Sequence, residues 1–159
     1  MEEPDQEVIT MKIKEQGNFS VNAAPARVLS LVSDPDFLGR TLPDSKGYRV
    51  TGSDVCVVEM KVGVSHMKGV MPTTLRVLPQ AHGEPLCIRV GAQGLGSRVD
   101  MELRFDLHDG QGATDIAWVS DATISGVLAS VGAGLLRPLA KRNFDAIVSA
   151  IQEAIEAAI

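Results

Sequence analysis

One carboxylate in this sequence is placed where it could do acid–base chemistry in an apolar interior. Glu15 lies in a stretch where apolar residues at 9, 11 and 13 alternate with polar residues at 10, 12 and 14, so parity puts it on the apolar face. A carboxylate inside an apolar cavity can act as a general base. A β-bulge at this position explains the pattern more simply and is the favoured interpretation, so Glu15 is a weak catalytic candidate.

The other residue types that carry out chemistry show no productive spacing. His66, His82 and His108 are far apart, and no HExxH, CxxC or two-histidine-one-carboxylate pattern occurs, so no metal site is predicted. Cys56 and Cys87 fall in mid-strand positions without a paired base, which favours buried, small apolar roles over nucleophilic catalysis. No metal or other cofactor is expected.

Glycines cluster at 91–96, 110–112 and 132–134, but no cluster joins a strand to a helix as a phosphate-binding loop would. The first two clusters are typical of hairpin turns. The third falls in a helical stretch, where glycine is unfavourable. It either relieves a kink at Pro138 and allows close packing, or leaves room for a ligand against the helix.

Composition excludes several classes of protein. The chain has 159 residues, enough for one domain over 1–159 with its own core, and its net charge of −5 disfavours nucleic acid as a partner. The acidic lead over 1–7 lacks the pattern of a signal peptide and is expected to be flexible, and no apolar run is long enough to span a membrane. A cytoplasmic protein without a transmembrane segment is therefore expected.

Hydrophobic periodicity predicts an α+β fold. A strand over 9–21 is followed by two short helices near 25–32 and 36–40, by strands from 47 to 124, and by a helix from about 126 to the C-terminus. Residues 98–107 alternate without interruption, which is typical of an antiparallel strand with one dry face. Pro138 is expected to kink or split the final helix, and Trp118 to lie buried against it.

The dry face of the sheet and the final helix together define a predicted ligand cavity. Aromatic residues are scarce, so its walls must be mainly aliphatic and rich in methionine, which suits a flexible apolar ligand as well as an ordinary core. Thr73 and Ser120 are the polar candidates for orienting such a ligand. The predicted cavity residues are Phe19, Tyr48, Val58, Met60, Met71, Thr73, Leu75, Met101, Leu103, Ile116, Trp118 and Ser120 from the strands, and Leu128, Val131 and Leu135 from the helix.

The order of elements and several short motifs resemble a known family. The most specific motif is Gly126-x-Leu128-Ala129-x-x-Gly132, and the others are Gly17–Val21 followed by Ala24-Pro25, Ser33-Asp34-Pro35, Leu42-Pro43, and Gly112–Ile116 leading to Trp118. Over residues 10–155 the chain is similar to the CoxG family, named for the G subunit of carbon monoxide dehydrogenase, within the START-like (SRPBCC) superfamily. The resemblance implies a helix-grip fold, in which a seven-stranded curved antiparallel sheet surrounds a long C-terminal helix, with two short helices after the first strand.

The same resemblance implies a function. Members of the family are associated with the maturation or membrane attachment of molybdenum hydroxylases such as carbon monoxide dehydrogenase, with a quinone-type lipid as proposed cargo. The chain is therefore expected to be a non-catalytic carrier of a hydrophobic small molecule, with a redox enzyme complex or a membrane surface as its partner. The chain departs from the family at two places. The strand Val70–Thr74 differs in sequence from that of relatives, which bears on ligand identity. The chain ends at Ile159 without the extension of some members, which bears on membrane anchoring. The alternatives are a cyclase- or dehydratase-type enzyme of the same fold and a protein-binding adaptor without ligand.

Overall fold

The computed structural model describes residues 9–81 and 83–158 and contains the expected succession of strands and helices. The described chain begins with β1 (Thr10–Val21), α1 (Pro25–Val32) and α2 (Pro35–Thr41). It continues with β2 (Ser45–Gly52), β3 (Val55–Val64), β4 (Met67–Val77), β5 (Leu86–Gly94), β6 (Ser97–Asp109) and β7 (Thr114–Gly126), which are followed by α3 (Val127–Ser130) and α4 (Ala133–Ala157). The acidic lead that is expected to be flexible lies outside the described residues.

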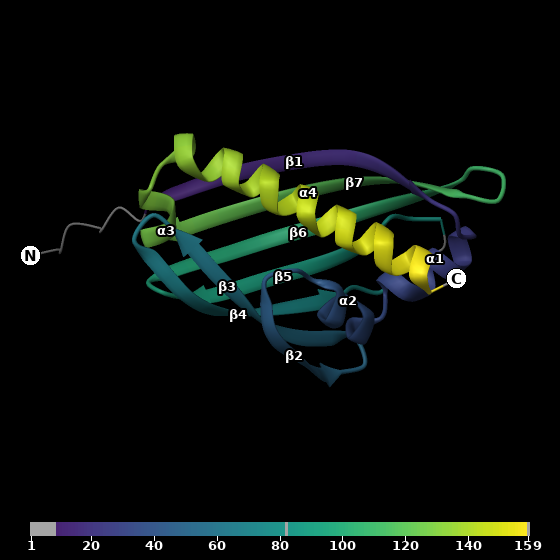
Figure 1. The fold of residues 1–159 in the computed structure, drawn as a ribbon, viewed down its shortest axis with the longest axis horizontal. Helices are drawn as coiled ribbons and strands as arrows, with labels where there is room; N and C mark the ends of the chain where they lie inside the picture. Colours follow the sequence, from purple (N-terminus) through teal and green to yellow (C-terminus); the bar gives the residue numbers. More distant parts are fainter. Residues whose placement is uncertain (1–8, 82, 159) are drawn as a thin grey trace, which may run out of the picture.

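The seven described strands form one antiparallel sheet in the order β1-β7-β6-β5-β4-β3-β2. Strands β2 to β7 form a meander, and β1 pairs with β7 in an unbroken register from Thr10↔Ser125 to Val21↔Thr114. Long strands twist, so the sheet curls around a concave face that α4 crosses (Figure 1). The helix-grip fold expected from the sequence is confirmed.

Two short helices close one end of the concave face. Pro25 and Pro35 lie in the first helical turns of α1 and α2. The Asp34 side chain accepts a hydrogen bond from the Asp36 backbone N–H at 3.0 Å, which caps α2. Helix α2 packs on β2, β3 and α4, and its Phe37 is only 1% exposed. The pair of helices therefore seals this end of the core.

The final helical segment differs from the expectation of a helix that is continuous from 126 and kinked or split at Pro138. The break lies earlier, at Gly132, where a φ of +94° separates α3 from α4. Glycine adopts such a φ without the strain that a side chain would cause. Pro138 lies inside α4 and does not divide it. The expected start of the long helix near 126 and a split at Pro138 are therefore wrong, and α3 is a separate short turn.

The hydrophobic core of the described residues consists of two clusters toward opposite ends of the concave face (Figure 1). We call the end closed by α1, α2 and the last turns of α4 the helical end; its cluster includes Phe37, Ile151 and Ile155. We call the end formed by the β3–β4 and β5–β6 turns, α3 and the first turns of α4 the turn end. Its cluster is smaller and consists of Ile13, Val64, Ile124, Leu128, Ala129 and Leu136.

Candidate ligand-binding groove

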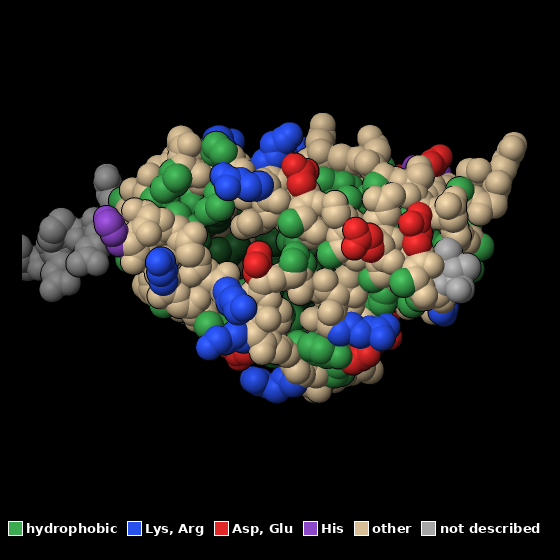
Figure 2. Space-filling model, in the orientation of Figure 1, with side chains coloured by type: hydrophobic (Ala, Val, Ile, Leu, Met, Phe, Trp, Pro, Cys, Tyr) green, Lys and Arg blue, Asp and Glu red, His purple; other side chains and the backbone are tan. Residues whose placement is uncertain are grey.

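A hollow opens between α4 and the concave face of the sheet. Figure 2 shows it as a depression toward the turn end, with hydrophobic side chains inside it and Lys and Arg side chains around it. Helix α4 packs along β1 and reaches α2, so it does not cover the strands farther from β1 along their whole length. We call this space the groove.

Several hydrophobic side chains on the concave face keep part of their surface exposed. Met60, Met101 and Leu103 are half-buried, whereas Val58 and Ile88 on the same face are 0% and 1% exposed. Protein cores are packed closely enough to leave few voids, so an ordinary core would close over all of these side chains. The half-buried stripe therefore marks the part of the concave face that stays open to solvent.

Most of the predicted cavity residues are buried or half-buried on the concave side of the sheet. The buried ones are Val58, Met71, Thr73, Leu75, Ile116, Trp118, Ser120 and Leu128, and the half-buried ones are Phe19, Met60, Met101, Leu103 and Val131. Strand alternation brings the strand residues together, since residues i and i+2 of a strand share a face, whereas Leu128 and Val131 come from α3 and its C-cap.

Tyr48, which is expected to line the cavity, lies instead against α2 and is 37% exposed. Its ring fills the space over Gly39, where an added Cβ would stand 2.4 Å from Tyr48 Cδ2. Its hydroxyl donates a hydrogen bond to Asp36 at 2.8 Å, which raises the pKa of Tyr48. The ring therefore packs on α2, which lies beside β2, instead of lining the groove.

Leu135 also departs from expectation, because it is 46% exposed. The spacing of Leu128, Val131 and Leu135 fits one continuous helix, but the break at Gly132 changes the helical phase. Leu136 takes the inward position and is only 4% exposed.

Glu15 lies on the inward face of a regular strand. The register pairs Glu15 with Ser120 and contains no shift, so the bulge favoured from the sequence is absent. Ile13 and Gly17 share the face of Glu15. The Glu15 side chain is half-buried, and its carboxylate has no hydrogen bond or ion pair within the part of the chain that the structure describes.

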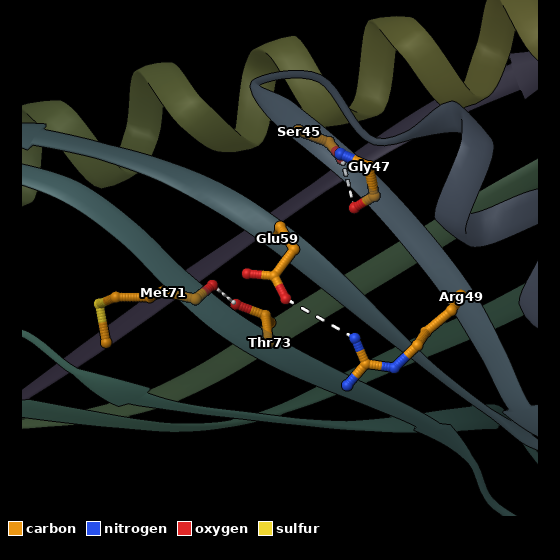
Figure 3. A network of polar contacts seen from close by, with 6 residues as sticks. All are labelled: Ser45, Gly47, Arg49, Glu59, Met71 and Thr73. Carbon is orange, nitrogen blue, oxygen red and sulfur yellow. Dashed lines mark hydrogen bonds and ion pairs between the residues drawn. The ribbon is translucent and has the colours of Figure 1, made fainter.

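The two polar candidates differ in what their hydroxyl groups do. Thr73 Oγ1 donates to the Met71 carbonyl oxygen of its own strand at 3.1 Å, so this hydroxyl is satisfied internally (Figure 3). Ser120 Oγ donates to Met101 Sδ at 3.0 Å, and a thioether sulfur is a weak acceptor. Ser120 is therefore the polar group on this face with the weaker internal partner.

An aromatic stack joins the sheet to α4 beside Glu15. The Trp118 and Phe144 ring centroids lie 5.4 Å apart with an interplanar angle of 22°. The indole lies over Gly17, where an added Cβ would stand 2.9 Å from Trp118 Nε1. The expected burial of Trp118 against the final helix is confirmed, at 7% exposed. Phe144 and Gly17 are absent from the cavity residues predicted above, although a glycine opposite a tryptophan signals room for a large ring.

Two further depressions lie outside the groove. One is on the outer face of the sheet and is lined by charged side chains such as Arg89, Glu102 and Asp121. The other lies between α2 and α4, where Phe37 and Ala154 are among its walls. Both are open to solvent, so neither encloses a ligand.

The described residues offer few groups for catalysis. Glu15 is the only carboxylate on the inward faces of the described strands, and Glu59 points outward to pair with Arg49 at 3.8 Å (Figure 3). No group of three or more His, Cys, Asp or Glu among the described residues could hold a metal ion. Burial raises the pKa of the Cys56 thiol, which keeps it protonated and weakly nucleophilic.

Comparison with known proteins adds a family and a set of similar structures. The model of the CoxG family, described as the G subunit of carbon monoxide dehydrogenase, matches residues 17–156. No curated protein matches the chain. A conserved protein from Geobacillus kaustophilus is similar in structure, with a TM-score of 0.78 and 20% identity over 92% of this chain and 97% of that one.

Two further solved structures share the fold. A START superfamily protein from Mycobacterium smegmatis has a TM-score of 0.67 and 18% identity over 92% of this chain and 99% of that one. The aromatase/cyclase Zhui from a Streptomyces species has a TM-score of 0.66 and 12% identity over 92% of this chain and 94% of that one. None of the helices that the structure describes is long and apolar enough to cross a membrane.

Proposed function

The chain belongs to the CoxG family, and we propose that it carries a lipid- or quinone-like molecule in the groove without catalysing a reaction. The observation that carries this proposal is the half-buried hydrophobic stripe under α4, which includes Met60, Met101 and Leu103. A ligand covering this stripe would gain about 25 cal/mol for each Å² of apolar surface removed from water. Methionine side chains adapt their shape, which suits a flexible cargo.

Two observations favour the carrier over the alternatives. A cyclase-type enzyme needs a convergent acid and base, and Glu15 has no second titratable carboxylate beside it on the inward faces of the described strands. An adaptor without ligand would be expected to have a filled core, and the half-buried stripe argues against one.

The proposed partner is a molybdenum hydroxylase such as carbon monoxide dehydrogenase, and its support is the description of the family. The proposed location is the cytoplasm, because Cys56 and Cys87 are unpaired and a reducing compartment keeps thiols in that state.

Peripheral membrane contact at the turn end would give an apolar cargo a route into the groove. Ile9, Leu95, Val127 and Leu135 are between 37% and 55% exposed there. Leu95 also adopts a φ of +53° at the tip of the β5–β6 turn, a conformation that glycine and asparagine adopt more easily than leucine. The Leu95 side chain lies partly over Gly69, where an added Cβ would stand 2.9 Å from its Cδ2, and its remaining exposed surface is available for contact with lipid.

A pair of substitutions on β7 tests the carrier proposal. Ala122 is half-buried on the inward face of the strand, whereas Ala117 is half-buried on its outer face. Ala122→Phe fills the groove and is expected to weaken binding of the neutral dye Nile red about tenfold or more, which corresponds to at least ~1.4 kcal/mol. Ala117→Phe is the matched control and retains binding.

The measurements are Nile red titration and thermal denaturation of the parent and both variants. A tightly packed core would respond to Ala122→Phe by losing about 1–3 kcal/mol of stability through overpacking. That loss, together with a parent protein that does not bind the dye, would show that the space is ordinary core and would favour the adaptor.

A further inference from the structure

We propose that Glu15, Ser120 and the indole N–H of Trp118 form a head-group site in the groove, which selects an amphiphile whose head donates a hydrogen bond, such as a phenol. This inference rests on the proposed function and narrows its ligand, because a quinone head only accepts hydrogen bonds and, among quinone-like molecules, only the reduced hydroquinone form donates them. The pairs Glu15↔Ser120 and Gly17↔Trp118 are neighbouring positions of the β1–β7 register on the inward face. The three polar groups therefore stand side by side on a face that is otherwise mainly apolar.

Glu15 supplies an acceptor that the protein itself leaves unused. Its half-buried carboxylate has no hydrogen bond or ion pair among the residues at 9–81 and 83–158. An ionised carboxylate can only accept hydrogen bonds. A ligand that covers it without offering a donor removes the water molecules that donate to it and puts no hydrogen bond in their place. A ligand that lies over Glu15 therefore binds well only if its head brings a donor.

Trp118 supplies a donor next to this acceptor. Its Nε1 lies over Gly17 and makes no hydrogen bond to any residue that the structure describes. Among those residues, no buried side-chain nitrogen or oxygen lacks a partner. Nε1 must therefore border open space, and since Trp118 faces inward, we assign that space to the head-group site. The stack with Phe144 holds the ring in this orientation.

Ser120 adds a hydroxyl that a ligand can recruit. Its present acceptor is Met101 Sδ at 3.0 Å, which is weaker than an oxygen acceptor. The Met101 side chain is flexible and half-buried, so it can move aside for a ligand. The Ser120 hydroxyl would then donate to an oxygen of the head group.

One oxygen of a hydroxyl head can satisfy both sides of the site. It donates a hydrogen bond to Glu15 and accepts a hydrogen bond from the Trp118 indole or from Ser120. An ether oxygen of the same size can accept but cannot donate, so it leaves Glu15 uncompensated. A carboxylate head is disfavoured because its charge has the same sign as that of Glu15.

A pair of matched ligands tests the head-group site. Dodecylphenol and dodecylanisole share ring and tail and differ only in the hydroxyl hydrogen, which a methyl group replaces. Trp118 is the only tryptophan in the chain, so the change of its emission reports binding at the site itself. We expect the parent protein to bind the phenol about tenfold more tightly than the anisole, since hydrogen bonds to charged groups are the strong ones.

Three variants assign this preference to Glu15. In Glu15→Leu the preference for the phenol is expected to disappear, and in Glu15→Gln, which keeps a neutral acceptor, it is expected to be intermediate. Asp121→Asn removes an exposed carboxylate on the outer face, beside Ser120 in sequence, and retains the full preference.

Equal affinity of the parent for both compounds, or a preference that survives undiminished in Glu15→Leu, would overturn the head-group site while Nile red binding still supported a carrier. If the parent binds neither compound and no Nile red, the carrier proposal fails and the head-group site fails with it.

Discussion

The helical end and the turn end of the molecule bury their hydrophobic side chains to very different degrees. At the helical end, Phe37, Ile151 and Ile155 are at most 4% exposed under α1, α2 and the last turns of α4. At the turn end, Val127 and Leu135 are 51% and 46% exposed, and α4 begins only after the break at Gly132. We infer that the helical end holds the fold together and that the turn end gives access to the groove.

The largest effect on stability is expected at the helical end. Phe37→Ala removes a completely buried ring and is expected to lower the free energy of unfolding by about 3–5 kcal/mol. Leu135→Ala at the turn end removes an exposed side chain and should change it by less than about 0.5 kcal/mol. Urea denaturation measures both, and equal losses would contradict the division between the two ends.

Smaller changes in the free energy of unfolding are expected where α4 begins. Replacing two nearby glycines by alanine should change it in opposite directions. Gly132→Ala places a side chain at a φ of +94° and should cost about 1–3 kcal/mol. Gly134→Ala lies within the first turn of α4 and should stabilise the protein by about 0.4–1 kcal/mol. An added Cβ meets nothing within 4 Å at either position, so only backbone conformation distinguishes them.

Thermal denaturation of the two glycine variants measures this difference. Equal changes in melting temperature would show that the positive φ at Gly132 is not required. The turn end would then lack the fixed break that sets the phase of α4.

The smallest effect is expected for Tyr48→Phe, beside α2. The hydrogen bond to Asp36 raises the pKa of Tyr48 in the folded state, so its contribution to stability is present below the unfolded-state pKa of about 10. The contribution is lost as pH rises through the folded-state pKa. Tyr48→Phe should therefore be slightly less stable than the parent at neutral pH and equally stable in strong alkali. A difference that stays constant across this pH range would exclude the hydrogen bond as its source.

The faces of the strands could be predicted from the sequence because a strand repeats every two residues whatever its surroundings. The inward positions of Met101 and Ile116 follow from this period alone, and Trp118 lies against the final helix as expected. The succession of strands and helices could be read in the same way, since each turn carries its own glycines and prolines.

Three site residues depend on features that periodicity does not contain. The outward position of Leu135 follows from a break at Gly132, and a helix has no fixed phase across such a break. Tyr48 packs on α2 because that helix lies beside β2, which only the tertiary structure reveals. A regular strand and a β-bulge at Glu15 give the same local pattern of apolar and polar residues, so only the pairing of β1 with β7 distinguishes the two conformations.

The most direct test of the carrier proposal is native mass spectrometry of the purified protein. The parent spectrum is expected to show the added mass of an amphiphile, at about one copy per chain, because the groove offers a single apolar space. The added mass should be lost in Ala122→Phe and kept in Ala117→Phe. A parent spectrum that shows only the bare chain, both after purification and after incubation with dodecylphenol, would contradict the proposal that this protein carries an apolar ligand.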